Sequence, residues 1–275
     1  MKTQFSASDF PANSKTKENY NLQFSDDFEK DHIDISNWLP FYLPQWSSMK
    51  MSKPHYQIKN GNLKLQILKN QKPWCPEFNG DVKCSSIQTG IYAGELGTDI
   101  GQHKFFNPEK CCVREEQKNQ FTYLPLYGFF EIRAKAINTA SNVVSLWMIG
   151  YEDQPEKSAE ICIFEIKGAA LSKNIAQIGY GIHKFNDPLL TEEFHEDTFE
   201  LDATKFHIYA AEWTPEKITF YIDNQKIRES KQSPNYPMQL MLGIYEIPTE
   251  KKDAADKIYP KEFIIDYVRG YSYKK

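Results

Sequence analysis

The chain has 275 residues, of which 40% are hydrophobic and 25% are charged. This composition is typical of a folded globular protein and excludes a disordered chain, a collagen and a coiled-coil rod. The formal net charge is −4, with both signs mixed along the chain, so we expect neither nucleic acid nor an anionic membrane as a partner. No window approaches 18 apolar residues, so we also expect no transmembrane helix.

Residues 1–19 are polar and lack periodicity, which predicts a flexible N-terminal arm before a single domain over residues 20–275. The N-terminus lacks a continuous apolar stretch of the signal-peptide type. We therefore expect a cytoplasmic protein if the chain is complete, and a secreted one if a signal was removed. The five cysteines include no CxxC pair and suggest neither a disulfide framework nor a zinc site, although one bridge such as Cys75–Cys84 stays open.

From Tyr20 onward, runs rich in Val, Ile, Tyr, Phe and Thr recur between turn signals, as strands do. The pair Tyr56–Asn60 and Asn62–Leu68 meets at Asn60-Gly61, a dipeptide typical of hairpin turns. We expect a short helix over Thr249–Lys257, capped by Thr249. Further strands are expected at Ser86–Tyr92, Tyr127–Ile137, Val143–Gly150, Ala159–Lys167, Ile175–His183, Phe206–Thr214, Lys217–Asp223, Pro237–Glu246 and Phe263–Tyr273. No repeat of fixed period interrupts them, so the pattern predicts one large antiparallel β-sandwich.

The segment AEICIFEIK (159–167) places Glu160, Cys162 and Glu165 in one apolar strand. In a regular strand Glu165 would face away from the other two, whereas one inserted residue, a β-bulge, would return it to their face. Two carboxyl groups on one face can serve a glycosidase, and a retaining mechanism needs them ~5–5.5 Å apart. The alternative is a pair of Glu on the solvent face of an amphipathic strand, which spacing alone leaves open.

This segment resembles the active-site strand of glycoside hydrolase family 16, whose signature is E-x-D-x-x-E. The resemblance extends, in the family's order, from FSDDF (24–28) through YGFFEIRAKA (127–136), SLWMIG (145–150) and FHIYAAEWTPEKITFYIDN (206–224) to FIIDYVRGY (263–271). It implies an all-β, concanavalin A-like jelly-roll sandwich of two curved antiparallel sheets. The concave face would form a cleft for an extended polysaccharide.

The resemblance implies that Glu160 is the nucleophile and Glu165 the general acid/base of a retaining endo-β-glycanase, with β-1,3- or β-1,3/1,4-glucan as the favoured substrate. Cys162 departs from the family, which has Asp at this place. A thiol is normally neutral at pH 7, so the exchange removes a like charge beside both carboxyl groups. We therefore expect altered or reduced activity. His183 on the following strand matches a family histidine near the acid/base.

Aromatic side chains would bind the sugar rings through their apolar faces. By resemblance, Trp147 and Trp213 flank the cleft and Glu212 binds a hydroxyl group, with core packing as the alternative for both tryptophans. The family's additional Trp just before this strand is missing, because Val143 stands there. Trp46 and Trp74 are expected in loops, as outer subsites or as packing residues. The loop residues Gly90–Tyr92 and Gly101–His103 are expected at the cleft rim.

Many relatives bind a structural Ca²⁺ on the convex face, and Asp266 matches a position that often supplies a carboxylate there. No cofactor is required for the expected reaction.

The expected partner is a polysaccharide or oligosaccharide, bound by a monomer. Two alternatives share the site: a carbohydrate-binding sandwich with weakened or lost catalysis, suggested by Cys162 and the missing Trp, and a transglycosylase that uses the same covalent intermediate. A structural sandwich without a sugar ligand is a further alternative, and the paired Glu argue against it.

Overall fold

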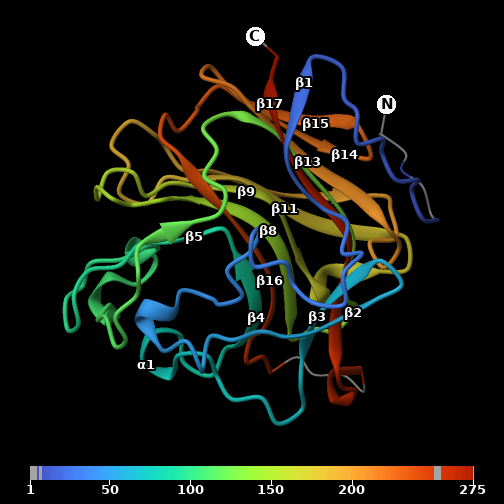
Figure 1. The fold of residues 1–275 in the computed structure, drawn as a ribbon. Coiled ribbons are helices and arrows are strands. Elements are labelled where there is room, and N and C mark those ends of the chain that lie inside the picture. The colour runs from blue at the N-terminus through green and yellow to red at the C-terminus, as the bar shows by residue number, and fades with distance from the viewer. Residues whose placement is uncertain (1–4, 6–7, 251–254, 275) are drawn as a thin grey trace.

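The computed structural model describes residues 5, 8–250 and 255–274. Two large antiparallel sheets face each other across a hydrophobic core, and helices are few and short (Figure 1). The expected all-β sandwich is therefore confirmed. No helix in the described ranges has the length and apolar character needed to cross a bilayer.

One sheet has eight strands in the order β15-β14-β13-β7-β17-β3-β2, and β1 also pairs with β17. The first half of the long strand β17 pairs with β3 and its second half pairs with β1, which places β1 and β17 side by side (Figure 1). The strands are β1 (Tyr20–Asp26), β2 (His55–Lys59), β3 (Asn62–Ile67), β7 (Gly128–Lys135), β13 (His207–Trp213), β14 (Ile218–Ile222), β15 (Gln225–Ser230) and β17 (Lys261–Tyr273).

The other sheet has seven strands in the order β10-β11-β9-β8-β16-β4, and β12 also pairs with β11. Its strands are β4 (Lys83–Gln88), β8 (Asn142–Gly150), β9 (Glu160–Lys167), β10 (Leu171–Ser172), β11 (Ile175–His183), β12 (Glu193–Phe199) and β16 (Met238–Glu246). Outside both sheets lie the pair β5 (Gly90–Ile91) and β6 (Gln120–Phe121), helix α1 (Pro76–Asn79), and the short 3-10 helices η1 (Pro44–Trp46), η2 (Lys104–Phe106), η3 (Pro108–Lys110), η4 (Gly168–Ala170) and η5 (Ala255–Lys257).

The apolar runs of the sequence become the central strands, with ends that agree or differ by at most three residues. At the β2–β3 turn, Asn60 and Gly61 both have positive φ, 55° and 67°, the geometry that favours an Asn-Gly hairpin. The expected strand over Ser86–Tyr92 is wrong in one respect, because it is divided into β4 and β5 at Thr89. Most of the expected helix at Thr249–Lys257 lies outside the described residues, whereas Ala255–Lys257 form η5.

Buried side chains form two main clusters, one on each face of the seven-stranded sheet. The larger lies between the sheets and contains, among others, Trp38, Phe164, Tyr209 and Trp213. The second lies under the loops that cover part of the outer face of the seven-stranded sheet and includes Trp147. Strand β8 is buried along its whole length. One of its faces contacts the core, and Trp147 and Ile149 on the other face pack under these loops. The loops thus cover part of the outer face of this sheet.

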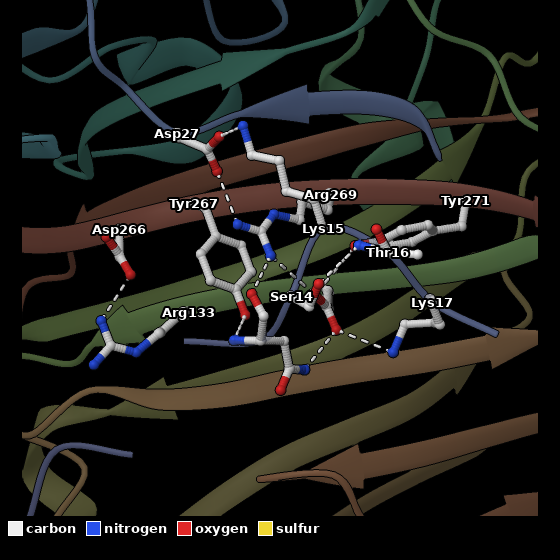
Figure 2. Close-up of polar contacts among 12 residues, drawn as sticks. Ser14, Lys15, Thr16, Lys17, Asp27, Arg133, Asp266, Tyr267, Arg269 and Tyr271 are labelled. Atoms are coloured by element: carbon white, nitrogen blue, oxygen red, sulfur yellow. Dashed lines mark hydrogen bonds and ion pairs between the residues drawn. The ribbon is translucent and has the colours of Figure 1, made fainter. Parts of the chain in front are cut away.

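The described residues of the N-terminal segment are docked on the eight-stranded sheet, which corrects the expected flexible arm. Figure 2 shows this segment beside the cluster around Arg269. The Asn13 side chain donates to Glu131 at 3.0 Å, and Lys17 Nζ lies 3.5 Å from the same fully buried carboxylate. Lys15 forms an ion pair with Asp27, which also holds Arg269 at 3.0 Å. The segment is ordered because it supplies partners to a carboxylate that would otherwise be costly to bury.

Candidate active site

A β-bulge in β9 brings the two glutamates to one face. Opposite β8, Phe164 pairs with Leu146 while Cys162 pairs with Trp147, so the register shifts by one residue between them. The opposite neighbour β11 shows the same shift, between Gly179 and Gly181. This is the inserted residue that the spacing of the sequence requires if Glu160 and Glu165 are to act together.

Both glutamates line one cleft on the outer face of the seven-stranded sheet, with a volume of about 540 Å³. Such a volume lies within the range of small-molecule binding sites. From β9 the cleft receives Glu160, Cys162, Glu165 and Lys167; from β8 it receives Val143, Ser145 and Trp147. The remaining lining residues come from β11, β16 and the loops: Tyr42, Asn79, Val82, His103, Phe106, His183, Phe185, Tyr245 and Ile247.

Burial controls the protonation of the carboxyl pair. It raises the pKa of Glu160 well above its usual range, and the nearby carboxylates of Glu165 and Glu192 raise it further. Burial also raises the pKa of Glu165, where the Lys167 ammonium, 3.6 Å away, opposes the shift. Because both pKa values are raised and like charges repel, we infer that the pair retains one proton over a broad pH range.

Cys162 lies between Glu160 and Glu165 in the sequence of β9, lines the same cleft and is buried. Burial raises the pKa of its thiol well above the usual value, and both glutamates add to the effect. The side chain is therefore neutral at pH 7 and is a poor nucleophile, since a thiolate is required for attack. It leaves the carboxyl pair without a third negative charge.

Trp147 and His183 both line the cleft. Trp147 lines the cleft beside the carboxyl pair, and its indole N–H donates to the Tyr245 hydroxyl at 3.2 Å. His183 pairs with Glu160 across β11 and β9. Its Nδ1 lies 2.5 Å from the carboxylate of Glu192, so its hydrogen bond goes to this exposed partner and not to Glu165.

Trp213 and Glu212 do not reach the cleft, which corrects their expected role in substrate binding. Both lie on β13 of the eight-stranded sheet. Trp213 is fully buried between the sheets and donates to Ser233 Oγ at 2.9 Å. Glu212 faces the outer side, where it accepts hydrogen bonds from Tyr221 at 3.0 Å and Tyr273 at 3.2 Å. Successive strand residues face opposite ways, and neither face of this sheet borders the cleft.

Three further sequence expectations concern residues of the loops and of β4. Trp46 and Trp74 are fully buried in the cluster under the loops, so they pack beneath these loops and are not outer subsites. Cys75 and Cys84 are free thiols, so the bridge between them is absent. Of the expected rim residues, His103 lines the cleft, whereas Gly90, Ile91, Tyr92, Gly101 and Gln102 are not among its lining residues. Phe106 and Phe185 also line it, and the sequence offered no pattern that identified them.

The residues around Asp266 do not fit a calcium ion. Its carboxylate accepts a hydrogen bond from Arg133 Nη1 at 2.7 Å, in a partly buried ion pair (Figure 2). Calcium needs six to eight oxygen ligands, whereas a guanidinium already holds this carboxylate. Across residues 5, 8–250 and 255–274, no group of three or more His, Cys, Asp or Glu is arranged to hold a metal ion.

A carboxyl pair on a bulged strand, set in a cleft on a jelly-roll sandwich, is the arrangement of a glycoside hydrolase. The family model of glycosyl hydrolases family 16 matches residues 45–268, and the chain belongs to this family. The resemblance drawn from the sequence is thereby confirmed.

Curated relatives are similar over part of the chain. A beta-glucanase from Rhodothermus marinus is 25% identical over 166 residues, which cover 53% of this chain and 57% of the relative. A beta-glucanase from Acetivibrio thermocellus is 28% identical over 120 residues, 43% of this chain and 34% of the relative. The chain thus matches just over half of one relative and about a third of the other.

Solved structures extend the likeness to nearly the whole chain. A GlcNAcα1-4Gal-releasing endo-β-galactosidase from Clostridium perfringens has a TM-score of 0.83 and 32% identity, covering 98% of this chain and 67% of that protein. An endo-1,3-β-glucanase (laminarinase) from Thermotoga petrophila has a TM-score of 0.64 and 18% identity, covering 94% of this chain and all of that domain. The second likeness shows the fold alone.

Proposed function

We propose that the protein is a retaining endo-β-glycanase that cleaves internal β-galactosidic bonds and releases a GlcNAcα1-4Gal disaccharide. The observation that carries the reaction type is the bulge in β9, which sets Glu160 and Glu165 in one cleft. The substrate is proposed from the Clostridium perfringens endo-β-galactosidase, because the 32% identity spans 98% of this chain. This proposal replaces the β-glucan favoured from the sequence.

The proposed reaction has two displacements. Glu160 attacks the anomeric carbon of the galactose residue while Glu165 protonates the departing glycosidic oxygen, which leaves a covalent galactosyl-enzyme ester. Glu165, now a carboxylate, then removes a proton from water, and the water oxygen attacks the same carbon and releases Glu160. Two inversions give net retention. This sequence needs one proton on the carboxyl pair, placed on Glu165 while Glu160 is ionised. In the empty cleft the pKa of Glu160 is raised more strongly than that of Glu165, so the proposal requires that substrate binding shifts the proton to Glu165.

The charges of the cleft favour a neutral substrate. Lys167 Nζ binds the Glu196 carboxylate at 2.7 Å and lies 3.6 Å from Glu165, while His183 binds Glu192 at 2.5 Å. These groups are engaged with carboxylates, and the glutamates themselves repel sulfated or uronic sugars. A chain of neutral hexoses and N-acetylhexosamines is compatible with this environment.

The experiment that tests the proposal is product analysis on a mucin glycan with terminal GlcNAcα1-4Galβ units, beside laminarin and lichenan. We expect wild type to release the disaccharide, and we expect Glu160→Gln and Glu165→Gln to lose at least about a thousandfold in rate, as when a catalytic group is removed. Release of glucose oligomers from laminarin, with the mucin glycan left intact, would refute the proposed substrate.

Cys162 supports a second candidate, a carbohydrate-binding protein with weakened catalysis. Its neutral thiol stands where the family has a carboxylate. The variant Cys162→Asp separates the two candidates in the same assay. If only this variant cleaves a polymer that wild type merely binds, the protein is a binding module.

A further inference from the structure

Resting on the proposed function, we propose that His103, with Phe106, Phe185 and Trp147, forms a preformed subsite that selects the N-acetyl group of the released disaccharide. In this subsite the acetamido methyl group packs on the aromatic rings, and the imidazole N–H donates to the acetamido carbonyl. His103 would thus be a specificity-determining residue, which binds substrate at a distance from the reacting atoms.

Three aromatic rings contact the imidazole of His103 in the lining of the cleft. The imidazole of His103 is stacked on the Phe106 ring at 5.0 Å and 13°, is tilted against Trp147 at 5.0 Å, and meets Phe185 edge-on at 5.3 Å. All four line the cleft. Aromatic faces of this kind hold apolar groups, such as a methyl group or the C–H face of a sugar.

The imidazole is built to bind as a neutral group. His103 is only 7% exposed, and burial, with the nearby His183, lowers its pKa to about 3. A neutral imidazole carries one N–H donor and one lone pair. Its Nδ1 is buried without a hydrogen-bond partner among the described residues. Because an unpaired N–H is costly to bury, we infer that Nδ1 carries the lone pair and that the proton is on Nε2. Nε2 is then the donor available to a ligand.

The loop holds this ring rigidly. His103 has a left-handed backbone with φ 61°, a strained conformation for a residue other than glycine. Its backbone N–H donates to the buried carboxylate of Glu152 at 2.6 Å, and the carbonyl of Gln102 accepts from Trp46 Nε1 at 2.8 Å. A rigid subsite loses little conformational entropy on binding. The strain is consistent with a position retained for binding.

The subsite lies on the side of the cleft that a donor sugar would occupy. His183 on β11 pairs with Glu160 on β9, and Phe185 follows His183 by two residues. Phe185 therefore lies near the end of β9 that begins with Glu160, away from the end with Lys167. The nucleophile contacts the anomeric carbon of the donor sugar, whereas the acid/base contacts the leaving oxygen. The GlcNAc residue attached to the donor galactose is therefore expected to lie next to the subsite formed by His103 and the aromatic rings.

The test compares two p-nitrophenyl β-galactosides, one carrying GlcNAcα1-4 and the other Glcα1-4, which differ in the acetamido group. We expect wild type to prefer the first in kcat/KM by about tenfold to a hundredfold, the range for one buried hydrogen bond with its packing. In His103→Phe, which keeps a ring but removes the donor, the preference should fall to about threefold or less. The loss in kcat/KM should be larger for the GlcNAc substrate than for the Glc substrate.

His55→Phe is the matched control, because His55 is exposed on β2, outside the cleft. Phe106→Ala serves as a second variant, because Phe106 is 52% exposed and its loss should lower the preference without unfolding the protein. An unchanged preference in His103→Phe, or equal cleavage of both substrates by wild type, overturns the inference and leaves the proposed function standing. Cleavage of neither substrate, with activity on laminarin, overturns both.

Discussion

Removal of the positive charge at Lys167 should raise the pKa of the acid/base. Lys167 Nζ lies 3.6 Å from Glu165 Oε1, and the two side chains are 47% and 31% exposed. At this separation Coulomb's law gives an attraction energy between the two charges of about 1 kcal/mol in water and about 4.6 kcal/mol at an effective dielectric constant of about 20. Because Lys167 is largely solvated and shared with Glu196, we take the lower value, which corresponds to roughly 0.7 pKa unit.

The sign of the effect follows from the role of Glu165. The acid must be protonated for the first step, so activity falls as pH rises through its pKa. Lys167→Met removes a cation that stabilises the carboxylate and leaves the Glu196 carboxylate nearby, and both changes raise the pKa of Glu165. We expect the alkaline limb of kcat/KM to move up by roughly 0.7 unit.

The assay is a kcat/KM profile from pH 4 to 10 for wild type, Lys167→Met and Lys167→Arg. The arginine variant keeps the charge, and its alkaline limb should stay near that of wild type. An unmoved or lowered alkaline limb in Lys167→Met would refute the assignment of Glu165 as the acid. A movement of the acidic limb alone would indicate that Glu165 acts ionised.

Four other changes test the site and the fold. Trp147→Ala should lower kcat/KM by about tenfold or more through lost ring contact with the sugar, measured on the aryl disaccharide. Trp213→Ala should reduce the free energy of unfolding by about 3–5 kcal/mol in urea, because this ring is in the core. Lys17→Met should reduce it by about 1 kcal/mol, since Glu131 loses one of its charged partners. EDTA or added CaCl₂ should leave Tm unchanged, because a guanidinium already holds Asp266.

Each of these expectations has a contrary result. Normal kcat/KM in Trp147→Ala would remove this ring from the substrate site, and a stable Trp213→Ala with impaired binding would return that residue to it. An unchanged free energy of unfolding in Lys17→Met would mean that the N-terminal segment contributes little. A rise of several degrees in Tm with CaCl₂ would reveal a calcium site that the arrangement around Asp266 does not suggest.

The catalytic strand was predictable because its chemistry is local. Glu160 and Glu165 fall within six consecutive residues, and only a bulge lets them share a face. The same holds for the β2–β3 hairpin, where Asn60-Gly61 sets the turn. In both cases the deciding residues are neighbours in sequence.

The remaining errors arose where the role of a residue depends on distant segments. Alternation along β13 predicts that Glu212 and Trp213 face opposite sides of their sheet. It does not predict to which sheet the strand belongs, and the choice of sheet decides whether either side chain borders the cleft. The N-terminal segment has no periodicity, since its order comes from single contacts with Glu131, over a hundred residues away. His103 was expected at the rim, but its contacts with the aromatic rings depend on a loop conformation with positive φ, for which its sequence carries no local signal.

The missed strands have a different cause. β12 and β15 lie at the edges of their sheets and expose much of their length. Charged side chains are common on edge strands, because they discourage pairing with other chains. Such strands lack the apolar runs by which the central strands were found.

The measurement that tests the central claim most directly is the anomeric form of the first product. Proton NMR would follow hydrolysis of the β-linked GlcNAcα1-4Gal substrate by wild type from the first minutes. A nucleophile at Glu160 and an acid/base at Glu165 predict that the β anomer of the released disaccharide forms first and that the α anomer grows in later by mutarotation. Initial formation of the α anomer would contradict the account, because it would require an inverting arrangement of the two carboxyl groups.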